Sequence, residues 1–388
     1  MMTEKADVVV IGGGFMGAAS AFFLRQRARS VILLERGLIG QQASGVNFGN
    51  VRRQGRYLPQ LPLANRSRAI WSRLTELIGT DCEFLATGHL RICYRREDVG
   101  ELEAYATHAR EYGLDLELLT QRALIARYPY LGPEIVAASL SPQDGHANPR
   151  LAAPAFGRAA RSAGAQIHEN TEVVGVTRSG EDFLIESADG RRFSAPTLLI
   201  TAGAWATQLS AQLGETAPLV VRGPQMGVTE PVPYRVEPVV GVMTNDPREV
   251  IYLRQVTRGN IVFGGGGRGP ADATARRAYV LPGNILNQFR QLGRLVPDIR
   301  RLNLIRVWSG IESYLPDDCP IMGESPTVPG LYYAFGFCGH GFQLGPGVGE
   351  TMAELIDTGT TEIDLAPYRI ERFAEAAPIA LPEVELSE

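Results

Sequence analysis

The sequence predicts a two-domain α/β protein in which a Rossmann-like dinucleotide-binding domain is joined to a second domain with an antiparallel sheet. Two glycine-rich turns support this prediction, one near each end of the chain, and each follows a β-branched or aromatic strand-like run. Between them lie two blocks of strands punctuated by Pro and Gly. The chain has 388 residues, of which 45% are hydrophobic, enough to bury two cores.

The first turn has the spacing of a dinucleotide-binding fingerprint. A strand at 7–11 is followed by Gly12-Gly13-Gly14-Phe15-Met16-Gly17 and by a helix-forming segment at 18–24. Gly12 permits the sharp turn, Gly14 lets backbone approach a pyrophosphate, and Gly17 lets the helix pack against the strand. The next predicted strand, 30–34, ends in Glu35, where a carboxylate would accept hydrogen bonds from an adenosine ribose. The alternative is an accidental glycine-rich turn.

The segment that follows favours FAD over a nicotinamide cofactor. Residues 41–56, QQASGVNFGNVRRQGR, form an irregular loop where a nicotinamide domain would have its third strand. Such a loop can run beneath a flavin, with hydroxyl and amide groups on the phosphates and ribityl chain and arginines near the ring. The alternative is a surface loop whose arginines face water. The residues concerned are Ser44, Asn47, Asn50, Arg52, Arg53 and Arg56.

Segments far apart in the chain complete the expected cofactor domain. Strands are predicted at 168–176, 196–200 and 331–335, and a second glycine-rich turn, 336–349, opens a helix at 350–356. Backbone N–H groups at a helix start suit the negative charge of a reduced flavin. We therefore expect a discontinuous FAD domain over 1–85, 146–212 and 306–377, a substrate domain over 86–145 and 213–305, and a flexible tail at 378–388. The substrate domain has a predicted helix at 97–112 and strands at 249–254 and 260–263.

The composition excludes several functions. The 38 basic residues include a single lysine, Lys5, so the chain has 37 arginines and no lysine for a P-loop or a pyridoxal Schiff base. The net charge of −4 argues against nucleic-acid binding. Cysteines at 82, 93, 319 and 338 form no CxxC pair, so we expect no metal site and a reducing, cytoplasmic location. The uncharged run 8–24 fits strand, turn and helix better than a membrane span.

Four motifs together resemble the D-amino acid oxidase, glycine oxidase and sarcosine oxidase superfamily of glutathione-reductase-type flavoproteins. They are the GxGxxG turn with Glu35, TAGAW at 201–205, WSG at 308–310 leading to Pro316 and Pro320, and GFCGHGFQLGPGVG at 336–349. The resemblance covers nearly the whole chain and is greatest to the β subunits of opine oxidases and of hydroxyproline or proline dehydrogenases. It implies FAD and oxidation of the C–N bond of an amino acid or amine by hydride transfer to flavin N5, giving an imine that water hydrolyses.

The resemblance also implies a set of site residues. Arg52 would lie near the reactive face of the flavin, and His340 would contact the flavin or serve as a hydrogen-bonded framework residue. Tyr252 and Arg254 share one face of a predicted strand and are candidate substrate contacts. The expected FAD contacts are Gly12, Gly14, Gly17, Glu35, Arg36, Ser44, Val173, Gly203, Gly339, His340, Gly341, Phe342 and Gln343.

Departures from the superfamily pattern refine these expectations. Single-chain sarcosine oxidases place a lysine over the flavin to activate dioxygen, and this chain has none to place there. The absence favours transfer of electrons to another carrier, although Arg52 or Arg254 could replace that cation. The cysteine that tethers FAD in those enzymes would fall near Gly310, so we expect non-covalent FAD.

Glu312 stands where glycine oxidase-like members have the arginine of a WxGxR pattern, which clamps the substrate carboxylate. Either another arginine binds that carboxylate, or the substrate presents a cation to Glu312. We hypothesise that Glu312 receives an ammonium or guanidinium; the alternative is a salt bridge to a neighbouring arginine. The arginines available for the carboxylate are Arg52, Arg56, Arg222 and Arg254.

The leading functional prediction is an FAD-dependent dehydrogenase of a secondary or D-configured amino acid, of opine, hydroxyproline, proline or sarcosine type. It would pass electrons through a second flavin or iron-sulfur subunit. One alternative is a free-standing oxidase of glycine, sarcosine or a D-amino acid that makes hydrogen peroxide. Another is a non-catalytic flavin-binding subunit of a complex. The residues reveal no acid–base dyad for the amine.

Overall fold

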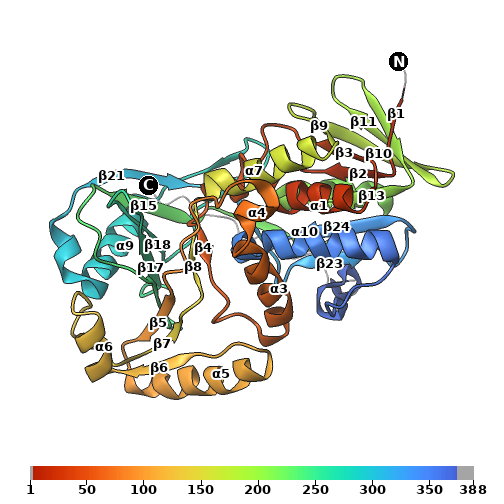
Figure 1. Ribbon diagram of the computed structural model, residues 1–388. Coiled ribbons are helices and arrows are strands. Elements are labelled where there is room, and N and C mark those ends of the chain that lie inside the picture. Colours follow the sequence, from red (N-terminus) through yellow and green to blue (C-terminus); the bar gives the residue numbers. More distant parts are fainter. Residues whose placement is uncertain (1–2, 374–388) are drawn as a thin grey trace.

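The computed structural model describes residues 3–373, so the tail predicted at 378–388 lies outside the described residues. The chain forms two lobes that lie side by side (Figure 1). One lobe contains the first and last helices of the fold, α1 (Phe15–Gln26) and α10 (Gly341–Thr358), and the other contains a large sheet. The two-domain α/β fold predicted from the sequence is confirmed.

The first lobe is built on a six-stranded sheet whose strands are parallel except for β23 at one edge. Its central strand shows why the β-branched run is buried on both sides: Val8 and Val10 pack against helices, whereas Val9 and Ile11 pack against a second sheet. The order is β23 (Ile321–Glu324), β24 (Leu331–Phe335), β13 (Thr197–Ile200), β2 (Val8–Ile11), β3 (Val31–Leu34) and β9 (Gln166–His168).

Helices cover one face of this sheet, and a four-stranded sheet covers the other. The helices are α1, α10, α3 (Leu61–Trp71), α4 (Leu74–Ile78) and α7 (Pro149–Ser162). The covering sheet has the order β1 (Glu4–Lys5), β12 (Arg192–Ala195), β11 (Asp182–Ser187) and β10 (Val173–Ser179). Segments from both ends of the chain meet here, since α1 and α10 lie next to each other (Figure 1).

The second glycine-rich segment differs from its prediction. It was expected to be a turn up to residue 349, but helix α10 already begins at Gly341. Its later glycines allow close helix packing: a Cβ at Gly345 would lie 2.5 Å from the Phe15 ring, and one at Gly349 would lie 2.5 Å from Ala19 Cβ. These two glycines therefore allow α10 to pack closely against α1. The interpretation of the segment as a turn missed this reason for glycine.

The second lobe is an eight-stranded sheet, antiparallel except where β16 runs parallel to β5. Helix α9 (Pro282–Leu295) packs against one face, and α5 (Val99–Glu111) and α6 (Gln121–Arg127) flank the sheet. The order is β21 (Leu304–Ser309), β15 (Gln225–Thr229), β18 (Ile261–Gly265), β17 (Ile251–Gln255), β16 (Val239–Val242), β5 (His89–Cys93), β7 (Ala137–Ser141) and β6 (Glu117–Thr120).

The predicted domain bounds cross one strand of this lobe. Strand β21 pairs with β15, so residues 306–309 extend the second sheet although the sequence placed them in the FAD domain. The other predicted bounds stay predictions. Shorter elements are α2 (Ala43–Val46), α8 (Ala206–Ser210) and the pairs β4 (Asn50–Val51) with β8 (Gly145–His146), β14 (Val220–Arg222) with β22 (Glu312–Tyr314), and β19 (Ala271–Asp272) with β20 (Arg277–Ala278).

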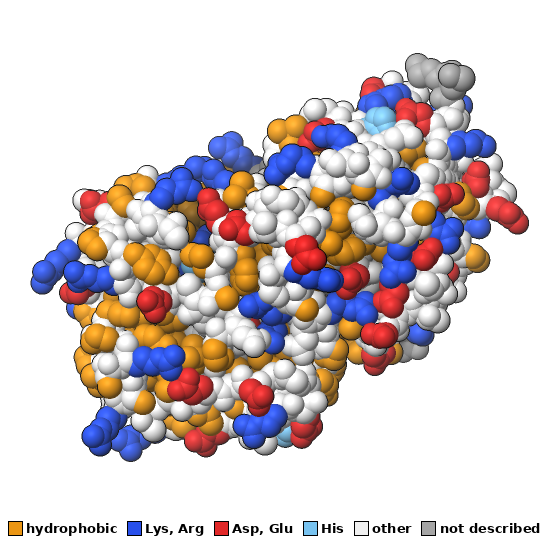
Figure 2. All heavy atoms as spheres, viewed as in Figure 1, with side chains coloured by type: hydrophobic (Ala, Val, Ile, Leu, Met, Phe, Trp, Pro, Cys, Tyr) orange, Lys and Arg blue, Asp and Glu red, His pale blue; other side chains and the backbone are white. Residues whose placement is uncertain are grey.

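Acidic and basic side chains are interspersed over the face of the molecule drawn in Figure 2, without a field of a single sign. No helix within residues 3–373 is both long and apolar enough to cross a bilayer. In the same residues, no group of three or more His, Cys, Asp or Glu side chains is arranged to hold a metal ion.

Candidate active site

A cavity of about 560 Å³ is lined by both lobes. Backbone around Gly12 and Gly14, before α1, lines it together with Gly339 and Gly341, at the start of α10. Strands β5, β16 and β17 of the eight-stranded sheet contribute to its wall. The two glycine-rich segments, far apart in the sequence, therefore border one cavity.

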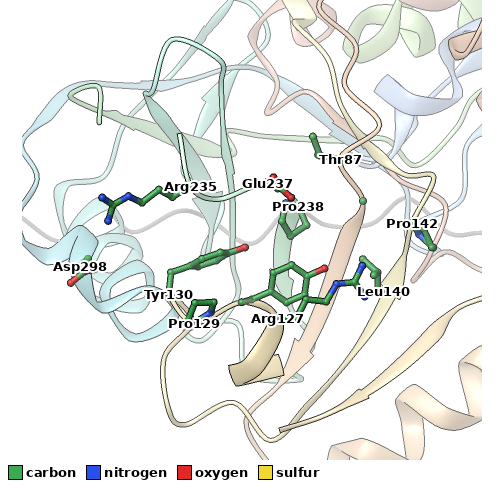
Figure 3. A pocket seen from close by; sticks show the side chains of 12 residues that line it. Thr87, Arg127, Pro129, Tyr130, Leu140, Pro142, Arg235, Glu237, Pro238 and Asp298 are labelled. Atoms are coloured by element: carbon green, nitrogen blue, oxygen red, sulfur yellow. The ribbon is translucent and has the colours of Figure 1, made fainter. Parts of the chain in front are cut away.

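A second cavity of about 650 Å³ lies in the eight-stranded lobe, next to the ends of β5 and β7 (Figure 3). It shares no lining residue with the first and contains neither glycine-rich segment. We therefore place the candidate active site in the first cavity. The second is lined by Thr87, Gly88, Arg127, Tyr128, Pro129, Tyr130, Leu140, Pro142, Arg235, Glu237, Pro238 and Asp298.

The end of the first cavity beside α1 is organised around Glu35. Its carboxylate accepts the N–H groups of Gly13 at 2.6 Å and Gly37 at 2.7 Å, which fixes the turn between β2 and α1. Ser44 Oγ accepts the N–H of Phe15 at 2.8 Å, so one of the free N–H groups at the start of α1 is satisfied from the following loop. Glu35 and Ser44 both line the cavity, as expected.

Arg36, Val173 and Gly203 also line this end of the cavity. The Arg36 guanidinium lies over the Trp205 ring, 4.1 Å from its centroid, and 3.7 Å from a Glu172 oxygen. Burial lowers the pKa of Arg36. Gly17 does not line the cavity: a Cβ there would lie 2.0 Å from the Gly12 carbonyl oxygen, so this glycine permits close packing of helix on strand.

The loop at 41–56 is not a solvated surface loop. Arg53 and Arg56 are only 8% and 5% exposed, and Arg53 Nε lies 2.9 Å from the buried carboxylate of Asp144. Arg56 donates to the backbone carbonyls of Arg52 at 3.0 Å and His340 at 3.2 Å. Burial, together with the Arg52 charge, lowers the pKa of Arg56 to about 9. The loop is thus fastened to the start of α10 by buried guanidinium groups.

His340 is held in one tautomer by Arg52. The Arg52 guanidinium lies 3.2 Å from His340 Nδ1, and because a guanidinium only donates, Nδ1 must accept and the ring proton must lie on Nε2. Burial, with Arg52, Arg56 and Arg268 nearby, holds the pKa of His340 well below its usual range. His340 lines the cavity as a neutral donor and also anchors the arginine loop, as a framework residue would; its contact with the flavin stays a prediction.

Two cavity residues on β5 were missed from the sequence. His89 and Arg91 face the cavity, whereas Leu90 and Ile92 between them are buried in the core on the other side of the sheet. This alternation was the available signal. Burial lowers the pKa of Arg52, and the charge of the nearby Arg91 lowers it further. Neither Arg52 nor Arg91 has a carboxylate within 4.0 Å among the described residues, so both are half-buried cations without an ion-pair partner there.

The structure separates two residues that the sequence paired on β17. Tyr252 lines the cavity and packs edge-on against Phe48, with ring centroids 4.6 Å apart. Arg254 does not line the cavity; its Nε donates to the Phe48 carbonyl at 2.6 Å, and its guanidinium contacts His146. Both side chains lie on the same side of the strand, but the 48–49 loop covers Arg254.

Gln343 also lies outside the cavity. Its side-chain amide donates to the Ala64 carbonyl at 2.8 Å, so it joins α10 to α3. Gly341 and Phe342, the two residues before it, do line the cavity. Arg268 was a further omission of the sequence analysis; it follows the glycine run 264–267 and lies over the Tyr314 ring at 3.9 Å.

Glu312 lies on β22 and lines the cavity. Arg222 is its cross-strand neighbour on β14, yet no arginine of the described part of the chain lies within 4.0 Å of the Glu312 carboxylate. The salt bridge considered as the alternative for Glu312 is therefore not formed in residues 3–373. Burial raises the pKa of Glu312 to about 7.

The family model of the FAD dependent oxidoreductases (DAO) matches residues 7–355. The chain belongs to this family. Glycine oxidase of Geobacillus kaustophilus is 30% identical over 96% of this chain and 98% of that protein. Sarcosine oxidase subunit beta of Rhodobacter capsulatus is 26% identical over 96% of this chain and 89% of that protein. The solved structure of L-proline dehydrogenase from P. horikoshii superposes with a TM-score of 0.89, at 28% identity over 96% of this chain and 99% of that one.

Membership of the DAO family confirms that the chain is an FAD-dependent oxidoreductase and that FAD is its cofactor. The cavity fits such a group. The start of α1 offers N–H groups to a diphosphate, and Gly14 leaves its approach open, since a Cβ there would meet only Ser44 Oγ at 3.2 Å. Asn50 lines the cavity, and its Oδ1 is buried without a hydrogen-bond partner among the described residues. A cofactor with donor groups would satisfy this oxygen.

Proposed function

We propose that this DAO-family chain oxidises the C–N bond of an amino acid or secondary amine that carries a carboxylate. One observation carries the proposal: among the described residues, the half-buried guanidiniums of Arg52 and Arg91 in the cavity have no carboxylate within ion-pair distance, and the half-buried carboxylate of Glu312 has no basic partner. A buried charge is costly unless it is paired, and a zwitterionic ligand would pair both kinds.

The residues divide the work as follows. Arg52 and Arg91 would bind the substrate carboxylate, and Glu312 would face its nitrogen. Tyr252 would close the wall of the sheet over the substrate. Bound FAD supplies the acceptor for a hydride from the carbon next to the nitrogen, and the resulting imine hydrolyses in water. An opine adds a second carboxylate, for which Arg268 at the cavity wall is a suitable partner.

We further propose that the electrons leave through another carrier and not through dioxygen. The single lysine, Lys5, lies on β1 of the covering sheet and does not line the cavity, so no ammonium is available to stabilise superoxide there. The name of the sarcosine oxidase relative describes it as a subunit, which supports a partner that accepts electrons. The second flavin or iron-sulfur subunit, non-covalent attachment of FAD and the cytoplasmic location stay predictions.

A free-standing oxidase is the second candidate. This chain aligns with nearly the whole length of the glycine oxidase relative. Arg52 is a cation at the cavity wall that could take the place of the missing lysine. A lysine-free site is expected to reduce oxygen slowly, so the two candidates predict different acceptors.

Anaerobic mixing of the purified yellow protein with glycine, sarcosine, L-proline, D-alanine and an opine tests the proposal. We expect at least one carboxylate-bearing amine to bleach the flavin absorbance, and the matching amine without a carboxylate to fail. Peroxide formation in air is then compared with reduction of an artificial dye. A protein that bleaches with none of these compounds contradicts the proposed function and favours a non-catalytic subunit.

A further inference from the structure

The sequence revealed no acid–base pair for the substrate amine. Glu312 places a carboxylate in the cavity where such a group is needed. It begins β22, directly after the WSGI segment, and its carboxylate lines the cavity that also contains Arg52 and His340. One carboxylate oxygen accepts the N–H of Ser313 at 3.3 Å, and the backbone of Gly339, from the segment before α10, helps to lower the pKa of the carboxyl group against the effect of burial. The carboxylate keeps lone pairs for a ligand.

We propose that Glu312 is the general base that takes the proton from the substrate ammonium before oxidation. The inference rests on the proposed function, because it needs an amine substrate in this cavity. An ammonium has no lone pair on nitrogen with which to assist the departure of a hydride, so the substrate must first lose a proton.

The other titratable side chains of the cavity cannot take this role near neutral pH. His340 Nδ1 already accepts from Arg52, and its other ring nitrogen carries the proton. His89 Nδ1 lies 2.9 Å from the Gln54 side-chain nitrogen, which also faces two backbone carbonyls and is therefore a donor. Burial raises the pKa of Tyr252, so its hydroxyl stays protonated. Burial likewise raises the pKa values of Tyr314 and Cys338. Glu35 is held by backbone N–H groups at the other end of the cavity, where Glu172 pairs with Arg276 at 2.6 Å.

The surroundings of Glu312 suit a group that must exchange a proton. Burial raises its pKa to about 7, and the backbone donors and Arg268 oppose that rise. A base whose pKa lies near the working pH is charged often enough to accept a proton and weak enough to release it. The titratable or charged groups that interact with it are Arg268 after β18, Tyr314 on its own strand and Cys338 before α10, and Arg222 is its cross-strand neighbour on β14. Tyr252 on β17 and His340 before α10 line the same cavity.

The proton transfer balances without a further reactant. One N–H bond of the substrate ammonium breaks, and an O–H bond forms on the Glu312 carboxylate, so the ammonium becomes a neutral amine and the carboxylate becomes a carboxylic acid. The C–H bond then breaks with its electron pair going to FAD, the oxidant that the family supplies. Glu312 returns its proton to water after the imine has left.

The test compares the wild-type holoenzyme with Glu312→Gln by anaerobic stopped-flow reduction with sarcosine and with L-proline between pH 6 and pH 10. In the wild type, we expect the second-order rate of flavin bleaching to rise with pH through about 7 and then to level off. In Glu312→Gln, we expect a loss of about 10²- to 10⁴-fold at pH 7. Its rate should then increase tenfold per pH unit toward the pKa of the free amine, because only neutral amine reacts.

Two further variants separate proton transfer from a structural effect. Glu312→Asp should restore part of the wild-type rate and its pH dependence. Glu324→Gln removes an exposed carboxylate on β23 that does not line the cavity, and it should behave as the wild type. Difference infrared spectroscopy gives a readout without turnover: the wild type should show a protonated-carboxyl band that disappears as the pH rises through 7, and Glu312→Gln should lack it.

The outcomes distinguish this inference from the proposed function. If the flavin bleaches and Glu312→Gln keeps the wild-type pH profile, the base assignment is wrong and the proposed function stands. If no amine of the panel bleaches either protein, the proposed function fails and the base assignment fails with it. A wild-type infrared spectrum without a carboxyl band that titrates near pH 7 also contradicts the assignment.

Discussion

At the end of the cavity beside α1, the charged side chains have partners within the chain, whereas at the end beside the eight-stranded sheet several charged side chains have none of opposite charge within residues 3–373. At the first end, the carboxylate oxygens of Glu35 accept hydrogen bonds from the N–H groups of Gly13 and Gly37. At the second end, Arg52 and Glu312 lack partners of opposite charge among the described residues, and burial shifts the pKa values of both. The carboxylate at the first end is therefore satisfied within the chain, whereas the charges at the second end are available to a ligand.

Removing a cation from the second end should have the largest effect. Arg52→Met takes away a buried partner of the substrate carboxylate and should lower kcat/KM by about 10²- to 10³-fold, equivalent to about 3–4 kcal/mol. Arg52→Lys keeps the charge but not the fork of donors that reaches Gln54 and His340, and it should recover only part of the loss. Wild-type kinetics for Arg52→Met, with the flavin spectrum intact, would show that the carboxylate binds elsewhere.

Glu312 also makes the second end sensitive to pH in the folded protein itself. Its pKa is raised from 4.5 to about 7, so ionisation disfavours the folded state. Wild-type stability relative to Glu312→Gln should be highest below about pH 4.5, fall as the pH rises through 7, and stay lower above it. The difference should be roughly 2–3 kcal/mol, measured by urea unfolding of the holoenzyme at pH 5 and pH 8. If the free energies of unfolding of wild type and Glu312→Gln differed by the same amount at pH 5 and at pH 8, the pKa of Glu312 would not be raised.

The size of the second end depends on Gly241 of β16, which lines the cavity. A Cβ at Gly241 would make only ordinary contacts, 3.7 Å from His89 Nε2 and from Tyr252 Cβ. Gly241→Ala should therefore be tolerated, whereas Gly241→Leu should project into the cavity. We expect Gly241→Leu to reduce kcat/KM for the largest accepted substrate roughly 10-fold more than for the smallest. A uniform loss for all substrates would place the substrate away from β16.

The smallest effect is expected at the first end. Ser44→Ala leaves the Phe15 N–H at the start of α1 without its acceptor and should cost about 1 kcal/mol of stability, with weaker FAD retention. Ser72→Ala, at the exposed end of α3, is the matched control and should change neither quantity. Thermal unfolding and flavin release on dilution measure both. A loss of FAD without a change in kcat/KM of the saturated enzyme would support the division between the two ends.

The first end could be predicted in detail because its signals are local. Gly12, Gly14 and Glu35 lie within or directly after one strand, turn, helix and strand, Ser44 follows on α2, and all four line the cavity. The second end was predicted only in part. Tyr252 and Glu312 face the cavity, but Arg254, on the same side of β17 as Tyr252, lies under the 48–49 loop.

The sequence by itself determined the dinucleotide fold, the family and the cofactor, since each follows from short motifs whose own residues are close together along the chain. Only the tertiary structure decided which charges meet in the cavity: Arg91 faces it and Arg254 does not, and Gly345 and Gly349 bring α10 against α1. The physical reason is that alternation along a strand gives the side on which a residue lies, whereas the chain packed over that side decides what it contacts.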